Sequence, residues 1–290
     1  MNVHTNGSAA VHSAAQEEGC HIFNDFGCGF QAPTTELFFP APWVEFGLPG
    51  TSGITKYLLV LIIATLVSMA FWYFTTRNPK VVPTRAQSVA ELFVGFVRDQ
   101  ITRNTMGKAG DKYIPLMVTL FIFIFTMNVM GLIPGLQLPV TSNLAFPAVL
   151  ALFIYILWNA VGIRRHGVGA HFKARMVPAG VPGYLLPVVV PIEAISNFVI
   201  RPFTHAVRLF AVMFAGHLLL AVFAAAGFYM FNPMTPMGPL LGGVSVLYSG
   251  IALFGFLVFT VFELFIMAVQ AYVFVLLASV YIGEAMEGAH

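Results

Sequence analysis

Six ionisable side chains lie in the two long apolar stretches that end the chain: Glu193, Arg201, His205, Arg208, His217 and Glu263. Arg208 has the highest cost, because a guanidinium near a bilayer centre costs at least roughly 3 kcal/mol. It cannot escape that cost by losing its proton, since its pKa stays above about 12. We therefore expect water, dipoles or a carboxylate to meet Arg208 at membrane depth, and we treat this need as a functional signal.

Spacing places several of these groups on one side of a helix. Glu193, Asn197, Arg201, Thr204 and Arg208 are separated by steps of three or four residues, which is the repeat of one helical face. Pro202 could disturb the stripe locally.

Two polar pairings agree on how the final helices would face each other. In an antiparallel hairpin, opposed residues lie equally far along the chain from the turn. Pairing His217 with Glu263, or Arg208 with Gln270, centres the turn near Pro239 in both cases. An opposed imidazole and carboxylate can both titrate when buried and coupled, so we predict a proton relay at His217 and Glu263. Packed histidine remains the alternative.

The same register brings Glu193 near Glu284 and Glu287. This end could form a water-accessible acidic vestibule, or it could be an ordinary solvated helix end. We expect Arg201 to extend its side chain to the interface or to contact phosphate. His205 is expected to be a packed or interfacial histidine.

The composition is that of an integral membrane protein. The 290 residues are 58% hydrophobic and 9% charged, with a mean hydropathy of +0.84, whereas soluble domains carry about 25% charged residues. A net charge of +2 argues against a nucleic-acid surface. Cys20 and Cys28 are too few for a disulfide scaffold or a four-ligand zinc site, and could form one bridge or remain two thiols.

The hydropathy pattern predicts an all-α fold with five membrane-crossing helices, at about 57–74, 113–132, 145–163, 185–230 and 243–282. The last two are twice the length needed, so we expect two tilted helices in an antiparallel hairpin. An amphipathic helix at about 87–104 should lie at the interface, or serve as a partner-binding surface helix. Residues 1–50 would be an extracytoplasmic tail before a single membrane domain at 51–290.

Lysine and arginine placement predicts the orientation. The connection after the first span has seven such residues, that before the fourth span has four, and the other two connections have none. Under the positive-inside rule, the N-terminus lies outside and the C-terminus in the cytoplasm.

Several motifs together resemble a known family. They are Arg201-Pro202, Val207-Arg208-Leu209-Phe210, Met213-Phe214-Ala215-Gly216, Asn128-Val129-Met130-Gly131-Leu132-Ile133-Pro134, and the run Ala268-Val269-Gln270-Ala271-Tyr272-Val273-Phe274-Val275-Leu276-Leu277. In this order, over roughly residues 79–285, the chain resembles subunit a of the F-type ATP synthase.

The resemblance implies roles for individual positions. Arg208 matches the family's essential arginine, which faces a rotating ring of subunit c, and Gln270 matches a glutamine near it. His217 and Glu263 stand where one family variant has a carboxylate and a histidine, so the pair is exchanged here. Ala211 and Val212 replace a frequent Gly-Asn, which questions the polar role of that asparagine.

The implied function is that of a stator subunit in the bacterial plasma (inner) membrane, which does not itself catalyse ATP chemistry. Protons would pass through two offset half-channels separated by Arg208. His217, Glu263 and Gln270 would serve the outside path, and Glu193, Asn197 and Arg201 the cytoplasmic one. Expected partners are the subunit c ring, the peripheral-stalk subunit b, other synthase subunits and lipid, with no cofactor, metal or nucleic acid. A secondary transporter with a midplane ion site and a non-transporting membrane anchor are the alternatives.

Overall fold

A computed structural model describes residues 33, 38, 56–76, 85–133, 138–177, 183–230 and 239–287. Within these residues the chain is almost entirely helical and contains no strand, which confirms the all-α prediction. Five helical stretches are long and apolar enough to cross a membrane: Lys56–Thr75, Gln87–Leu132, Ala145–His166, Leu186–Met230 and Val244–Met286. The predicted tail at 1–50, apart from residues 33 and 38, lies outside the described residues, as do Cys20 and Cys28.

The contacts divide the chain into two units. Unit 1 combines residues 1–34 with Leu218–Thr260, and unit 2 combines Thr35–His217 with Val261–His290. The helices α9 (Arg201–Met230) and α10 (Pro239–Glu287) each contribute residues to both units. At ~1.5 Å per residue, the 49 residues of α10 extend for about 70 Å, more than twice a ~30 Å hydrocarbon core.

In unit 1, α9 and α10 approach closely at small residues. A Cβ atom on Gly227 would lie 2.7 Å from Leu253 Cδ2, so a larger residue would force the helices apart. The hydroxyl of Ser249 donates to the carbonyl of Gly227 at 2.7 Å. Small residues that permit close backbone approach are the usual solution in lipid, where helices gain little from hydrophobic burial alone.

Unit 2 contains the helices α2 (Lys56–Thr76), α3 (Arg85–Phe96), α4 (Arg103–Met106), α5 (Ile114–Val129), α6 (Ala145–His166), α7 (Val168–Met176) and α8 (Leu186–Ile195). Buried residues of α2, α4, α5, α6, α9 and α10 form one apolar core. Fully buried side chains in the core include Met117 and Ile124 of α5, Met213 of α9, and Met267 and Val275 of α10. The core therefore fixes the part of the α9–α10 hairpin that carries the polar residues.

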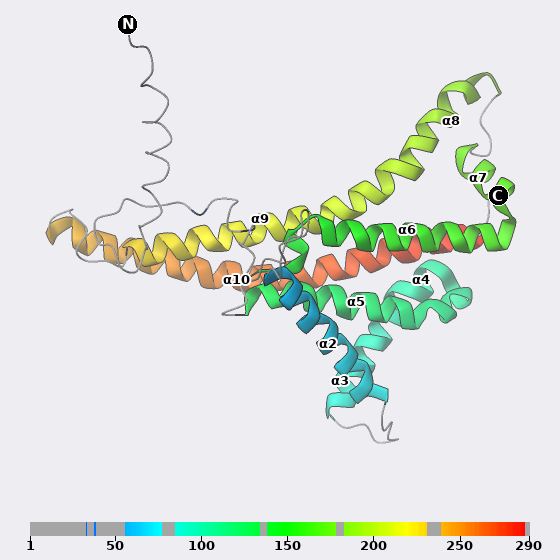
Figure 1. Cartoon of the computed structure of the whole chain (residues 1–290). Helices are drawn as coiled ribbons and strands as arrows, with labels where there is room; N and C mark the ends of the chain where they lie inside the picture. The colour runs from blue at the N-terminus through cyan, green and yellow to red at the C-terminus, as the bar shows by residue number, and fades with distance from the viewer. Residues whose placement is uncertain are drawn as a thin grey trace, which may run out of the picture. The chain divides into compact units, whose positions relative to one another are not determined.

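The helical path of the fourth span is interrupted just before Pro202. Ser196–Ile200 forms a π-helical turn, and the backbone N–H of Arg201 donates to Ser196 O. Proline lacks an N–H and its ring clashes with the carbonyl four residues earlier, so a departure from regular α-helix next to Pro202 is expected. Figure 1 shows the chain changing direction between α8 and α9. The sequence predicted a disturbance at Pro202, but not that the preceding turn would absorb it.

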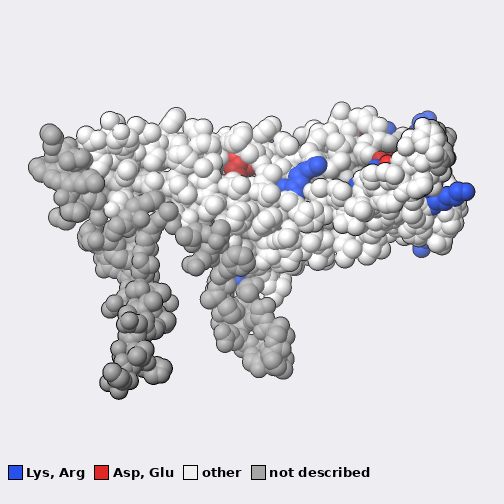
Figure 2. Space-filling model, turned by 90° about the horizontal axis from the view of Figure 1, so that it is seen from above, with Lys and Arg blue, Asp and Glu red and all other residues white. Residues whose placement is uncertain are grey.

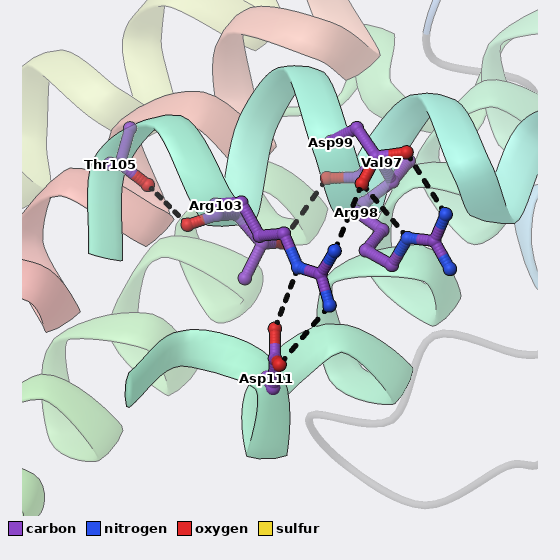
Figure 3. Close-up of polar contacts among 7 residues, drawn as sticks. Val97, Arg98, Asp99, Arg103, Thr105 and Asp111 are labelled. Atoms are coloured by element: carbon purple, nitrogen blue, oxygen red, sulfur yellow. Dashed lines mark hydrogen bonds and ion pairs between the residues drawn. The ribbon is translucent and has the colours of Figure 1, made fainter. Parts of the chain in front are cut away.

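The segment expected as an interfacial helix at 87–104 is part of a longer helical stretch. α3 continues through a π-helical turn at Val97–Thr102 into α4, and Gly107, with a φ of 58°, turns the chain into a 3-10 helix at Gly107–Tyr113. Arg103 pairs with Asp111 at 3.0 Å and Arg98 with Asp99 at 2.9 Å, as Figure 3 shows. Of these two exposed pairs, only Arg103–Asp111 joins α4 to the 3-10 helix, and such exposed ion pairs contribute little to stability.

Candidate functional site

The hairpin brings His217 of α9 and Glu263 of α10 together inside unit 2. The distance from His217 Nδ1 to Glu263 Oε1 is 3.8 Å, and the two side chains are 10% and 4% exposed. Gly216 leaves room for this approach, because a Cβ atom there would lie 3.2 Å from Glu263 Oε1 and the carboxylate would have to shift by a few tenths of an ångström. The predicted apposition is thus present in the structure, and the small residue before the histidine provides the room for it.

An aromatic side chain lies beside the pair. Neither carboxylate oxygen of Glu263 has a hydrogen-bond partner among the described residues. An unpaired buried carboxylate is costly, so an adjacent imidazole or water is needed to stabilise its charge. The ring of Phe38 lies 6.1 Å from the His217 ring in an edge-on arrangement, and 4.5 Å from the ring of Phe214.

Phe38 packs beside His217, and the sequence did not predict that it would belong to the site. Its side chain is 1% exposed, and its carbonyl accepts a 2.7 Å hydrogen bond from the hydroxyl of Tyr57 in α2. The same hydroxyl lies 3.4 Å from Ser142 Oγ. A single phenylalanine in a segment without periodicity carries no signal that it packs on a residue far along the chain.

Arg208 is exposed, whereas Arg201 is half-buried and Glu263 is buried. Its neighbour Leu209 is fully buried in the core, and at 3.6 residues per turn Arg208 lies about 100° around α9 from it. Across the described ranges, no carboxylate lies within ion-pair distance of it. Figure 2 shows that charged groups are few on the face it draws.

Gln270 lies level with Arg208 along the hairpin. Contacts on either side fix this level, because His205 packs on Phe274 with ring centroids 3.9 Å apart and His217 meets Glu263. Gln270 is half-buried, and no hydrogen bond between it and Arg208 is present in the described part of the chain.

Arg201 has an ion-pair partner within the chain. Its Nη1 atom lies 2.7 Å from Glu284 Oε2, and Arg175 of α7 approaches the same oxygen at 3.6 Å. The Arg175 guanidinium also lies over the Trp158 ring, 4.1 Å from its centroid. Burial lowers the pKa of Arg175 to about 10, so it stays charged at neutral pH. We expected Arg201 to reach the interface or a phosphate, whereas a carboxylate on the neighbouring helix neutralises it.

Glu193 and Asn197 contact each other one helical turn apart. Asn197 Nδ2 donates to Glu193 Oε2 at 2.9 Å and to the carbonyl of Arg175 at 3.0 Å. Asn197 is buried and Glu193 half-buried. Glu284, expected beside Glu193 in an acidic vestibule, is engaged by the two arginines, and the side chain of Glu287 is outside those described.

His205 is packed, as expected from the sequence. It is 4% exposed, and neither ring nitrogen has a hydrogen-bond partner among the described residues. It borders a cavity of about 10 Å³ together with Arg201, Trp158 and Tyr281. Such a volume is near the minimum for one water molecule, which could satisfy a ring nitrogen.

The fold and site together define a class: a multi-pass helical membrane protein with an imidazole–carboxylate pair and an exposed arginine on its two longest helices. The family model described as ATP synthase A chain matches residues 58–283. That match covers most of the chain, which therefore belongs to this family.

Curated relatives agree with the family match. The chain is 41% identical to ATP synthase subunit a of Streptomyces lividans, over 99% of both chains. It is 38% identical to the subunit of the same name from Nocardioides sp., over 84% of this chain and 86% of the relative. The relative from Frankia alni is also 38% identical, over 90% of this chain and 88% of its own. The chain is thus a component of an ATP synthase that takes part in proton transport.

Val212, which stands in place of the family's frequent asparagine, is half-buried and packs against the apolar core of unit 2. An asparagine there would need a polar partner, so the substitution is consistent with a packing role at this position.

Proposed function

We propose that this chain is the stator subunit that delivers protons to a rotating ring of subunit c, and that Arg208 faces the ring carboxylates. The exposed guanidinium is the observation that carries the proposal. A cation on an apolar helix, with no carboxylate of its own chain near it among the described residues, needs an acid from outside.

Electrostatics determines where a ring carboxylate keeps its proton and where it loses it. A ring carboxylate facing lipid stays protonated, because an unpaired charge in hydrocarbon is prohibitive. A cation within ~4–6 Å lowers a carboxyl pKa by about 1–3 units, so the acid ionises as it passes Arg208. The permanent charge of Arg208 then blocks direct passage of protons between the two sides.

Two offset paths would reach the ring. His217 and Glu263, with Gln270 nearby, form the path from outside, supported by their burial and 3.8 Å approach. Glu193 and Asn197 form the cytoplasmic path, supported by their direct hydrogen bond. Arg201 contributes by holding Glu284 and thereby keeping that carboxylate out of the path. Each proton crossing 100 mV supplies about 2.3 kcal/mol.

We also propose the membrane orientation of the chain and its partners. The N-terminus lies outside and the C-terminus in the cytoplasm of a bacterial plasma membrane, supported by the lysine and arginine distribution. The chain assembles with the subunit c ring, peripheral-stalk subunit b and the other synthase subunits, and has no catalytic role in ATP chemistry. Nothing specific favours the secondary transporter or the membrane anchor, and family membership argues against both.

The test is an Arg208→Ala variant of the assembled complex in inverted membrane vesicles. ATP-driven proton pumping should disappear, while the subunit remains in the complex. Arg85→Ala is the matched control, because it removes an exposed arginine at the start of α3. Pumping near the wild-type rate in the Arg208 variant would contradict the proposal.

A further inference from the structure

An open pocket of about 470 Å³ lies in unit 2, away from the hairpin pair. Its cationic lining residues are Lys112 from the 3-10 helix at Gly107–Tyr113, and Arg164 and Arg165 from the last turn of α6. Leu157, Ala160 and Val161 of α6 form an apolar part of its wall. The volume falls within the range of pockets that bind small molecules.

The cations of this pocket are available to a ligand. Lys112, Arg164 and Arg165 are all exposed, and no ion pair involves them among the described residues. Asp111, the carboxylate beside Lys112 in sequence, is already paired with Arg103. Lys112 does lie 4.8 Å from the centroid of the Tyr113 ring, a contact that leaves its charge intact. Three like charges around one hollow favour an anion.

The arrangement along α6 specifies what kind of anion. Leu157, Ala160, Val161 and Arg164 are spaced by three, one and three residues, so they lie along one face of the helix. The apolar residues belong to a stretch that crosses the membrane, and the arginines follow at its end. A ligand that fits must be apolar along the helix and negative at its tip.

We propose that this pocket binds an anionic phospholipid, with the phosphate of its headgroup between Lys112, Arg164 and Arg165. One acyl chain would lie along Leu157, Ala160 and Val161. Basic pockets at the end of membrane helices are suited to such headgroups, and each Lys or Arg near the surface adds attraction. Inorganic phosphate shares the headgroup chemistry but would make no use of the apolar wall.

The experiment uses the purified complex in nanodiscs of phosphatidylcholine with a minor fraction of phosphatidylglycerol. After extraction into detergent, retained lipid is counted by native mass spectrometry. The Arg164→Gln/Arg165→Gln variant should retain phosphatidylglycerol with roughly thirty-fold lower affinity, the loss expected for two surface cations. Phosphatidylcholine retention should not change. Lys108→Gln/Lys173→Gln is the matched control, since it removes two exposed charges that do not line the pocket.

A second variant separates lipid from a soluble anion. Ala160→Trp fills the apolar wall and leaves all three cations in place, so it should also reduce phosphatidylglycerol retention. Equal retention in the wild type and the arginine variant would overturn the proposal. So would displacement of the bound lipid by millimolar inorganic phosphate, which would indicate a simple anion site. Crosslinking of Ala160→Cys to another synthase subunit, without anionic lipid, would assign the pocket to a protein partner.

Discussion

Exchanging the partners of the His217–Glu263 pair tests whether the two side chains act as one unit. The variants are His217→Glu, Glu263→His and the double exchange. At the observed 3.8 Å, two carboxylates would repel each other by ~4 kcal/mol at an effective dielectric constant of about 20. The two acids of His217→Glu therefore cannot both ionise, and the imidazole is lost. The double exchange restores one acid and one imidazole at the same separation.

ATP-driven acidification of inverted vesicles measures the consequence. Each single variant should pump slowly, and the double exchange should recover much of the loss. Directly contacting residues couple by up to roughly 3 kcal/mol, about a hundredfold in rate, so the recovery should be easily measured. Thr260→Ala serves as a control on α10, because its hydroxyl donates to Phe256 O of its own helix at 2.7 Å, and no other hydrogen bond of this hydroxyl is present among the described residues.

Two results would refute this reasoning. If the effects of the single variants simply multiply in the double exchange, the two groups act independently and do not relay protons to each other. If both single variants pump at the wild-type rate, the pair is a packing feature. Complex assembly must be compared in every variant, because loss of the subunit also abolishes pumping.

Three further predictions concern single positions. Gly216→Ala should slow pumping, because its Cβ must displace Glu263; unchanged pumping would mean that Glu263 has room to move. Gln270→Glu should abolish pumping by neutralising Arg208 within the chain; wild-type pumping would show that the two do not meet. Burial, with a smaller contribution from nearby Arg175, lowers the pKa of His171 below its ordinary 6.5. Below about pH 6.5 the unfolded state therefore binds a proton that the folded state does not, and the amides of α7 should become less protected from hydrogen exchange. Amide hydrogen exchange of α7 measures this, and a His171→Phe variant with the same acid response would contradict it.

Much of the hairpin could be predicted because its signals are simple. Long apolar runs require helices, and residues equally far from the turn must face each other, so His217 and Glu263 were paired from the sequence alone. Other details depend on contacts that carry no sequence pattern. The π-helical turn at Ser196–Ile200 reflects how the backbone accommodates Pro202. Phe38 reaches the site only through tertiary packing.

Arg201 shows a different limit of sequence reasoning. A snorkelling arginine and an ion-paired arginine have the same local sequence, and only the position of Glu284 distinguishes them. The pair departs slightly from the register of His217 and Glu263, as long side chains permit. We therefore expected snorkelling to the interface or a phosphate contact, where the structure has a carboxylate partner. A register can predict which helix faces align, but it cannot choose among the partners within reach of a flexible side chain.

The helix α10 presents a carboxylate to one arginine of α9 and a neutral amide to the other. Arg201 meets Glu284, whereas the residue level with Arg208 is Gln270, a neutral amide. A carboxylate at that level would neutralise Arg208 and remove its attraction for an acid outside the chain. An amide offers a dipole without competing for the charge. One arginine is thus neutralised within the chain and the other is left exposed within an apolar span, which supports our proposal that Arg208 pairs with a carboxylate of the ring.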